Sequence, residues 1–141
     1  MNIILQIATK LSAKQFEHEH PHNVDKAINA IVDANADLLK AYLRRFRGPI
    51  GSSRTSFQLL DAIEEQPNIV TQTTFLRSEF QLGQQWVAIS DIVGGSLLVL
   101  NTEKDKVFNV DFEGGIELLR DGTLPPISNS FEEFLIWFFV I

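Results

Sequence analysis

Three short apolar runs lie in the second half of the chain, at residues 86–89, 97–100 and 107–112. They are rich in Val, Leu, Ile, Phe and Trp, they have the length of β-strands, and turn residues separate them. The last run alternates, with Asn109 and Asp111 on the face opposite its apolar side chains. The middle run is apolar throughout, which predicts a central strand covered on both faces. The pattern therefore predicts a β-sheet built from this region.

Residues 24–46 carry the clearest helical pattern. Apolar side chains recur near the 3.6-residue period, and polar side chains occupy most of the other face. Asn23 is a suitable N-cap, while Gly48 and Pro49 follow the last apolar position. The pattern predicts one long amphipathic helix.

Other segments carry weaker patterns. Residues 1–11 fit either an edge strand or the first turns of a helix. We expect a short strand at residues 57–60, then a helical turn that is capped by Asp61 and ended by Pro67. The remaining expectations are a loop at 51–56, a loop or edge strand at 68–74, a loop or short helical turn at 75–82, and brief strand pairing at 116–119.

Two turns and a final helix complete the pattern. The two glycines in residues 91–95 indicate a hairpin turn, because a phosphate-binding loop requires a following helix and here a strand follows. The charged residues 102–106 indicate the next hairpin. Ser130 and Glu133 have capping-box spacing at the start of a helix that is apolar on every side over residues 135–141. Such a helix is either buried on most faces or meets a partner, through Trp137, Phe138 or Phe139.

Length and composition narrow the class of protein. The 141 residues, 45% of them hydrophobic, fit one domain spanning residues 1–141. No apolar run reaches the roughly 20 residues that span a bilayer, so we expect no membrane insertion. The N-terminal residues lack the basic leader of a signal peptide, and the absence of cysteine fits the cytosol, so we expect a cytoplasmic protein. The net charge of −6 argues against nucleic acid as a partner and is compatible with a basic protein.

The sequence contains no nucleophile elbow, no zinc-protease motif, no phosphate-binding loop and no dinucleotide fingerprint. His18, His20 and His22 lie in one polar stretch, and His-X-His spacing can place two imidazoles beside a divalent metal. The stretch offers no second ligand cluster, so a solvated loop is the preferred interpretation, and we predict neither a metal nor a cofactor. We therefore predict that the protein is not an enzyme.

Two charged clusters have simple structural explanations. Arg44, Arg45 and Arg47 fall near the end of the predicted helix, where cations complement its dipole. The alternative is that they hold an anion or an acidic partner. The adjacent pair Glu132 and Glu133 fits a helix cap better than a catalytic pair, because neighbouring helical residues point in different directions.

An ordered set of motifs runs through residues 86–135. It comprises a tryptophan-led strand at Trp86, the turn Gly94-Gly95, an apolar strand at 97–100, the strand Val107-Phe108-Asn109-Val110-Asp111, and the helix start Ser130-Phe131-Glu132-Glu133-Phe134-Leu135. This set resembles the SMI1/KNR4 family, which is the SUKH superfamily. Residues 57–65 are similar to the strand and short helix that precede these motifs in the family. Gly48-Pro49 stands where members usually have Leu-Pro and Asn-Gly signatures, which indicates a divergent subgroup.

The resemblance implies an α+β domain with a mixed or antiparallel sheet and helices packed around it. It also implies a binding role, because many bacterial members look like immunity proteins that occlude polymorphic toxins, while others act as regulatory or scaffold modules. It offers no catalytic residues to transfer. Our leading hypothesis is toxin neutralisation by direct binding, and the alternative is a regulatory module, with a possible homodimer through the C-terminal helix. The acidic positions that we expect to face a basic toxin are Glu64, Glu65, Asp91, Glu103, Asp105, Asp111 and Glu113.

Overall fold

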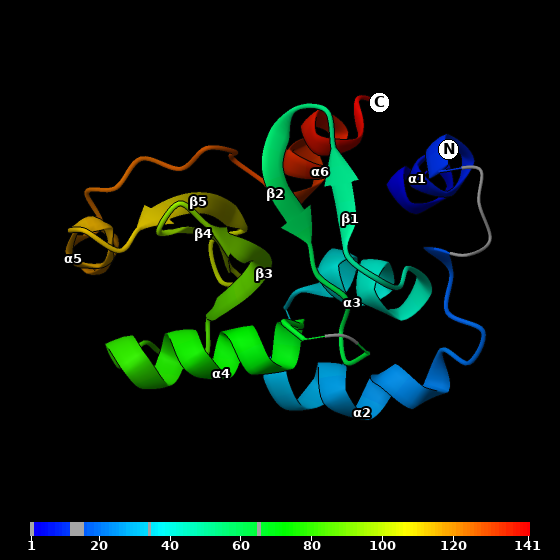
Figure 1. Cartoon of the computed structure of the whole chain (residues 1–141), viewed down its shortest axis with the longest axis horizontal. Helices are drawn as coiled ribbons and strands as arrows, with labels where there is room; N and C mark the ends of the chain where they lie inside the picture. The colour runs from blue at the N-terminus through cyan, green and yellow to red at the C-terminus, as the bar shows by residue number, and fades with distance from the viewer. Residues whose placement is uncertain (1, 12–15, 34, 65) are drawn as a thin grey trace.

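The computed structural model describes residues 2–11, 16–33, 35–64 and 66–141 (Figure 1). Helices and strands are mixed along the chain, which confirms the predicted α+β class. The helices are α1 (Ile3–Leu11), α2 (His22–Ile31), α3 (Asp37–Arg45), α4 (Ile69–Phe80), α5 (Gly115–Asp121) and α6 (Phe131–Phe139). The strands are β1 (Ile50–Ser52), β2 (Thr55–Leu59), β3 (Trp86–Val93), β4 (Ser96–Asn101) and β5 (Lys106–Asp111).

The five strands form one antiparallel sheet in the order of the sequence, β1-β2-β3-β4-β5. The three predicted apolar runs are β3, β4 and β5. The middle one lies between the other two, and its apolar residues are all buried, as expected for a covered central strand. Gly94 and Gly95 both have positive φ in the two-residue turn from β3 to β4, a conformation that glycine adopts without a steric penalty.

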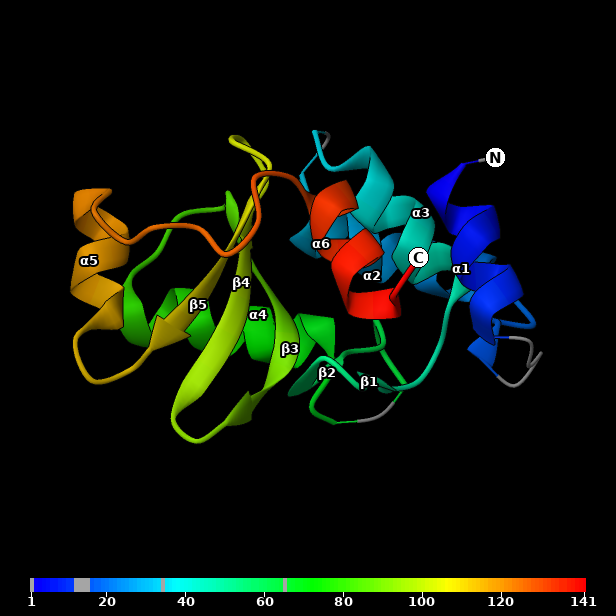
Figure 2. The ribbon, with the colours of Figure 1, turned by 90° about the horizontal axis from the view of Figure 1, so that it is seen from above.

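The two faces of this sheet carry different sets of helices. Leu97 and Val99 of β4 pack with Leu76 of α4 and with Ile116 and Leu119 of α5. The alternate residues of β4 face a larger core, which α1, α2, α3 and α6 complete. Figures 1 and 2 show α4 passing across β3, β4 and β5, with α6, α3 and α1 gathered toward the other end of the molecule.

Side chains of α4 complete the backbone hydrogen bonds of β3 where its register with β4 shifts, between Ala88 and Ile92. Thr73 Oγ1 accepts from the Ala88 N–H at 3.1 Å, and Gln72 Nε2 donates to the Ser90 carbonyl at 3.4 Å. Because buried backbone groups need partners, these polar side chains face the core rather than solvent.

The predicted helix over residues 24–46 is wrong, because the structure has two helices there. The chain leaves α2 at Val32, whose backbone is extended, and α3 begins at Asp37. Side-chain contacts hold the break: Asp33 Oδ1 accepts from the Asn35 N–H, and Asp33 Oδ2 accepts from the Thr102 hydroxyl at 3.0 Å. The predicted N-cap is also wrong, since Pro21 occupies that position without a side-chain cap.

One open alternative is settled, and other expectations change. Residues 2–11, left open between strand and helix, contain α1; residues 51–56 lie in the β1–β2 hairpin rather than a loop; and residues 116–119 lie in α5 rather than a strand. Residues 69–80 form α4 instead of loop, strand or a short turn. Its buried positions, Ile69, Gln72, Thr73 and Leu76, have helical spacing, but two of them are polar, which conceals the pattern.

The predicted caps are confirmed in part. Ser130 Oγ accepts from the Glu133 N–H at the start of α6. Asp61 Oδ2 accepts from the N–H groups of Ile63 and Glu64, although the described residues after Asp61 form a turn rather than a helix. Among the described helices, none is long and apolar enough to cross a membrane.

Candidate functional site

The sheet separates the predicted acidic residues into groups. Glu103 and Asp105 lie in the β4–β5 turn, where Lys104 and Lys106 alternate with them and neutralise the charge. Asp105 is also engaged within the chain, because its Oδ1 accepts from the Phe131 N–H at the start of α6. This turn therefore presents no net negative surface.

A second acidic group lies at the opposite end of these strands, around the β3–β4 turn. The register places Val93 beside Ser96, and Ser96 beside Asp111, so Asp91, Asp111 and Glu113 belong to the same end of the sheet. No Lys or Arg occurs in residues 87–103 or 107–119, so the strands contribute only negative charge here.

The two remaining acids are elsewhere. Glu64 follows β2, and its Oε2 lies 3.8 Å from Nε of Arg47. Glu65 lies outside the described residues. The predicted acidic residues thus do not form one continuous surface. Three of them lie at the β3–β4 end of the sheet, where Asp91 Oδ1 also accepts from the Gln58 N–H of β2 at 2.9 Å.

Three aromatic rings lie beside the acidic end of the sheet. Phe80 of α4 stacks on Phe112 at 5.4 Å between centroids, and Phe75 packs edge-on against both, at 6.1 and 6.4 Å. Phe75 is 40% exposed. Phe112 lies on the α4 side of the sheet with Val110, two residues earlier. We call Phe75, Phe80 and Phe112 the aromatic surface.

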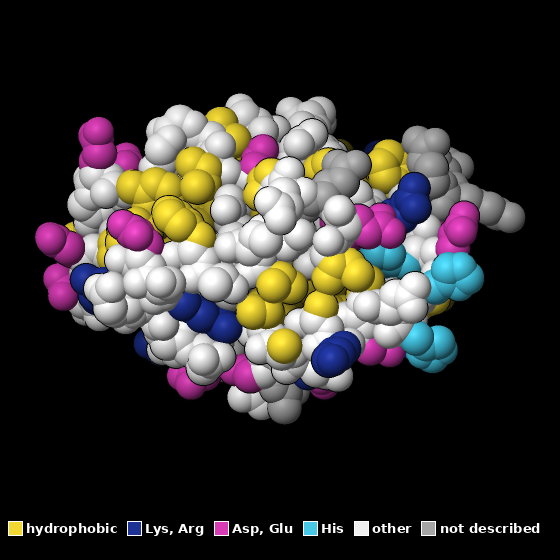
Figure 3. Space-filling model, turned by 60° about the horizontal axis from the view of Figure 1, so that its bottom comes forward, with side chains coloured by type: hydrophobic (Ala, Val, Ile, Leu, Met, Phe, Trp, Pro, Cys, Tyr) yellow, Lys and Arg dark blue, Asp and Glu magenta, His cyan; other side chains and the backbone are white. Residues whose placement is uncertain are grey.

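The surroundings of the aromatic surface are largely acidic. Glu79 is four residues after Phe75 on α4, which places both on one side of the helix, and Glu113 directly follows Phe112. One cation lies at the margin, because Arg120 of α5 donates to the Phe80 carbonyl. Figure 3 shows hydrophobic side chains gathered at the end of the molecule that carries α5 and the C-terminal end of α4, with acidic side chains around them.

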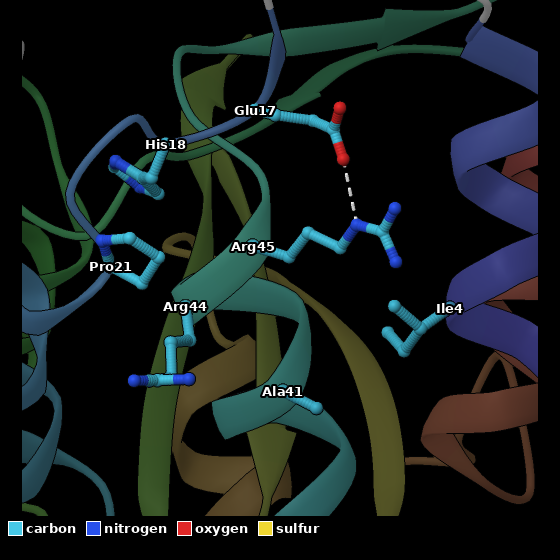
Figure 4. Close-up of a pocket in the computed structure, with 7 residues that line it drawn as sticks. All are labelled: Ile4, Glu17, His18, Pro21, Ala41, Arg44 and Arg45. Carbon is cyan, nitrogen blue, oxygen red and sulfur yellow. Dashed lines mark hydrogen bonds and ion pairs between the residues drawn. The ribbon is translucent and has the colours of Figure 1, made fainter. Parts of the chain in front are cut away.

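A separate cleft of about 530 Å³ lies between α1, α3 and the segment before α2 (Figure 4). Ile4 of α1 and Ala41 of α3 line it, and across it Arg45 Nε donates to Glu17 Oε1 at 2.8 Å. Arg44 also lines the cleft, and its Nε donates to Asp25 Oδ1 at 2.9 Å.

The three arginines near the end of α3 therefore each have an acidic partner within the chain, since Arg47 lies by Glu64. Exposed pairs of this kind stabilise a fold by at most about 1 kcal/mol each. Their positive charge is compensated locally, which favours the structural interpretation of this cluster over an anion site.

Sequence reasoning missed a buried polar contact behind this cleft. His18 and Asp61 have side chains that are 4% and 1% exposed, and His18 Nε2 lies 3.1 Å from Asp61 Oδ1. Burial, assisted by the Asp61 carboxylate, raises the pKa of Tyr42 well above its ordinary value. His18 and Asp61 are separated by more than 40 residues, so no local pattern in the sequence indicates their contact.

We compared the sequence with protein-family models and with curated proteins, and neither comparison gives a match. The resemblance to the SUKH superfamily therefore stays a prediction that depends on the motifs of residues 86–135.

Proposed function

We propose that this protein is a non-catalytic protein-binding domain of the immunity type, which neutralises a bacterial toxin by direct binding in the cytoplasm of the cell that makes it. The observation that carries the proposal is the aromatic surface with acidic residues at its margin. The motif resemblance to the SUKH superfamily supports the same function.

The chemistry of the surface favours a basic protein as the occupant. Exposed aromatic rings are typical anchors of protein interfaces, because they bury a large area with little loss of side-chain freedom. The net charge of −6 attracts a cationic partner over long distances, and the ends of β3, β4 and β5 at the β3–β4 turn, which carry acids but no Lys or Arg, place negative charge beside the rings. Occlusion of the toxin's active site then requires contact and charge complementarity, and no chemical step.

The anchor of the proposed interface is Phe75, because it is the most exposed ring of the three. Burying its exposed part against a partner contributes on the order of 1–2 kcal/mol from apolar area, and more if it lies at the centre of the interface. A stable complex buries about 800 Å² on each partner, so the interface extends beyond the rings to residues such as Glu79 and Glu113.

The proposal is tested by rescue of growth. Cells that express the C-terminal domain of a toxin encoded beside this gene are expected to survive when they also express the wild-type chain. Phe75→Ser is expected to reduce rescue. Ile127→Ser is the matched control, because Ile127 is 47% exposed and its backbone pairs with Val107, at the other end of β5. No rescue by the wild type removes the proposal.

A second candidate function is a regulatory module that forms a homodimer through α6. It is favoured by Ile136 and Trp137, which are 39% and 38% exposed on a helix whose other side is buried. Light scattering on the wild type and on Trp137→Asp discriminates between the candidates. A dimer that Trp137→Asp converts to a monomer supports the regulatory module, while a monomer in both cases rejects it.

A further inference from the structure

His18, Asp61 and Glu64 converge from two parts of the chain. His18 precedes α2, while Asp61 and Glu64 lie between β2 and α4. One imidazole nitrogen and one carboxylate oxygen from each acid lie within 4.8 Å of one another. Figure 3 shows histidine and acidic side chains adjacent at the end of the molecule opposite the aromatic surface.

The imidazole of His18 is incompletely satisfied where it stands. Its side chain is 4% exposed, and its Nε2 has no hydrogen-bond partner among the residues that the structure describes. Asp61 Oδ1 is 3.1 Å away, so the separation suits a hydrogen bond but the direction of the ring N–H does not. A buried nitrogen without a hydrogen-bond partner destabilises the fold, and a ligand at this position would remove that cost.

The distance of 3.1 Å between His18 Nε2 and Asp61 Oδ1 suits two ligands of one metal ion. Tetrahedral Zn²⁺ with bonds of about 2.0–2.2 Å holds its ligand atoms about 3.3–3.6 Å apart. Small movements of the three side chains are therefore enough to bring them to one centre.

Backbone contacts hold two of the three residues in place. Asp61 Oδ1 accepts from the Gly48 N–H at 3.0 Å, and Asp61 Oδ2 accepts from two further N–H groups, so the carboxylate is fixed while Oδ1 keeps a second lone pair. The His18 N–H donates to the Arg45 carbonyl at 2.8 Å. Such outer contacts orient metal ligands in known sites.

The third ligand, Glu64, connects the site to solvent. Glu64 is exposed and lines a cavity of about 140 Å³ together with His18, His20 and Arg47. A metal ion can therefore enter from solvent, and a water molecule can take the fourth position. The guanidinium of Arg47 competes for Glu64 and would move aside on binding.

We propose that His18, Asp61 and Glu64 form a binding site for a divalent transition-metal ion, with Zn²⁺ as the preferred ion. One imidazole and two carboxylates match Zn²⁺ better than Mg²⁺ or Ca²⁺, which favour oxygen ligands alone. The bound ion ties the segment before α2 to the β2–α4 connection. This site is independent of the proposed partner surface.

The test is calorimetric titration of the tag-free full chain with Zn²⁺, with thermal unfolding as a second readout. We expect one bound ion, a higher melting temperature with Zn²⁺, and no binding of Mg²⁺ at the same concentration. Glu64→Gln is expected to weaken Zn²⁺ binding at least tenfold, and His18→Gln at least as much. His22→Gln is the matched control and leaves binding unchanged, because the His22 side chain is 86% exposed and outside the cluster.

Three results would overturn the site: no Zn²⁺ binding by the wild type, equal binding by Glu64→Gln, or loss of binding in His22→Gln. If His18→Gln does not fold, Glu64→Gln still tests the site, because Glu64 is exposed and its substitution leaves the core intact. The hydrogen bond from the Glu64 backbone to Asp61 survives in Glu64→Gln.

Discussion

Tyr42 is the only tyrosine of the chain, and its side chain is 3% exposed. Removal of its phenol from water raises its pKa, and the negative charge of Asp61 acts in the same direction, because both disfavour the phenolate. The folded protein therefore keeps this proton at a pH where the unfolded chain loses it.

The sign of the pH dependence follows from this difference. Above the unfolded value of about 10, the folded state binds one more proton, so the free energy of unfolding falls by about 1.4 kcal/mol for each pH unit. Below that value the full stability is present. Tyr42→Phe is expected to remove this part of the slope.

Ultraviolet absorbance of the phenolate measures the effect at one residue. We expect the native protein to show no tyrosine ionisation near pH 10, where the urea-unfolded chain titrates with its ordinary pKa. Native ionisation near pH 10 with the fold intact would contradict the buried position of Tyr42.

At the scale of elements, Arg77 joins α4 to its neighbours. Its Nη2 donates to the carbonyl oxygens of Ile31 and Gln84, each at 2.7 Å, and its Nε donates to that of Trp86 at 3.0 Å. Burial lowers the pKa of Arg77, while the carboxylate of Asp33 opposes the shift. The side chain therefore links the end of α2, the body of α4 and the start of β3.

Replacement of Arg77 tests this link. Arg77→Met keeps most of the apolar stem but leaves three carbonyl groups without their donor, so we expect a loss of about 2–3 kcal/mol in unfolding free energy. Urea denaturation measures it. Arg54→Met, at an exposed position in the β1–β2 turn, is the control and is expected to change stability by less than about 0.5 kcal/mol. Equal effects of the two substitutions would show that the Arg77 contacts contribute little.

The sequence predicts elements well where apolar side chains alone face the core, as in β3, β4, β5 and α6. It fails at α4, because Gln72 and Thr73 face inward to serve the backbone of β3, a role that only the register shift of that strand explains. It also fails at the break after α2, which Thr102 stabilises from a distant turn. Polar contacts between remote segments leave no local periodicity.

The same reason limits prediction of the sites. Asp111 and Glu113 are identifiable as acids, but their separation from Glu103 and Asp105 depends on strand register. The sequence does not predict the aromatic surface, because the pattern of residues 75–82 favours a loop or a short helical turn. The His18 and Asp61 contact likewise requires the folded chain.

At the scale of the whole molecule, the charge is unevenly distributed. The acidic residues near Arg44, Arg45 and Arg47 form pairs within the chain, whereas the β3–β4 end adds only acids from its strands. A basic partner is therefore expected to approach the aromatic surface, and salt is expected to slow its association.

A matched pair of substitutions distinguishes a contact at the aromatic surface from a general effect of acidic charge on binding. Glu113→Gln removes charge beside the aromatic surface, and Glu103→Gln removes the same charge at the β4–β5 turn. If the proposed toxin partner exists, we expect its association to be slower only for Glu113→Gln, by about twofold to tenfold at low salt. Stopped-flow fluorescence measures both rates, and equal slowing by the two variants would place the contact elsewhere.

The most direct test of the proposed interface is calorimetric titration of the purified chain into the C-terminal domain of any toxin that is encoded beside the gene. We expect a one-to-one complex that weakens as salt rises. Phe75→Ser is expected to cost about 2 kcal/mol, or roughly thirtyfold in affinity, while Ile127→Ser binds like the wild type. Absence of a complex, or equal affinities for Phe75→Ser and Ile127→Ser, would contradict it.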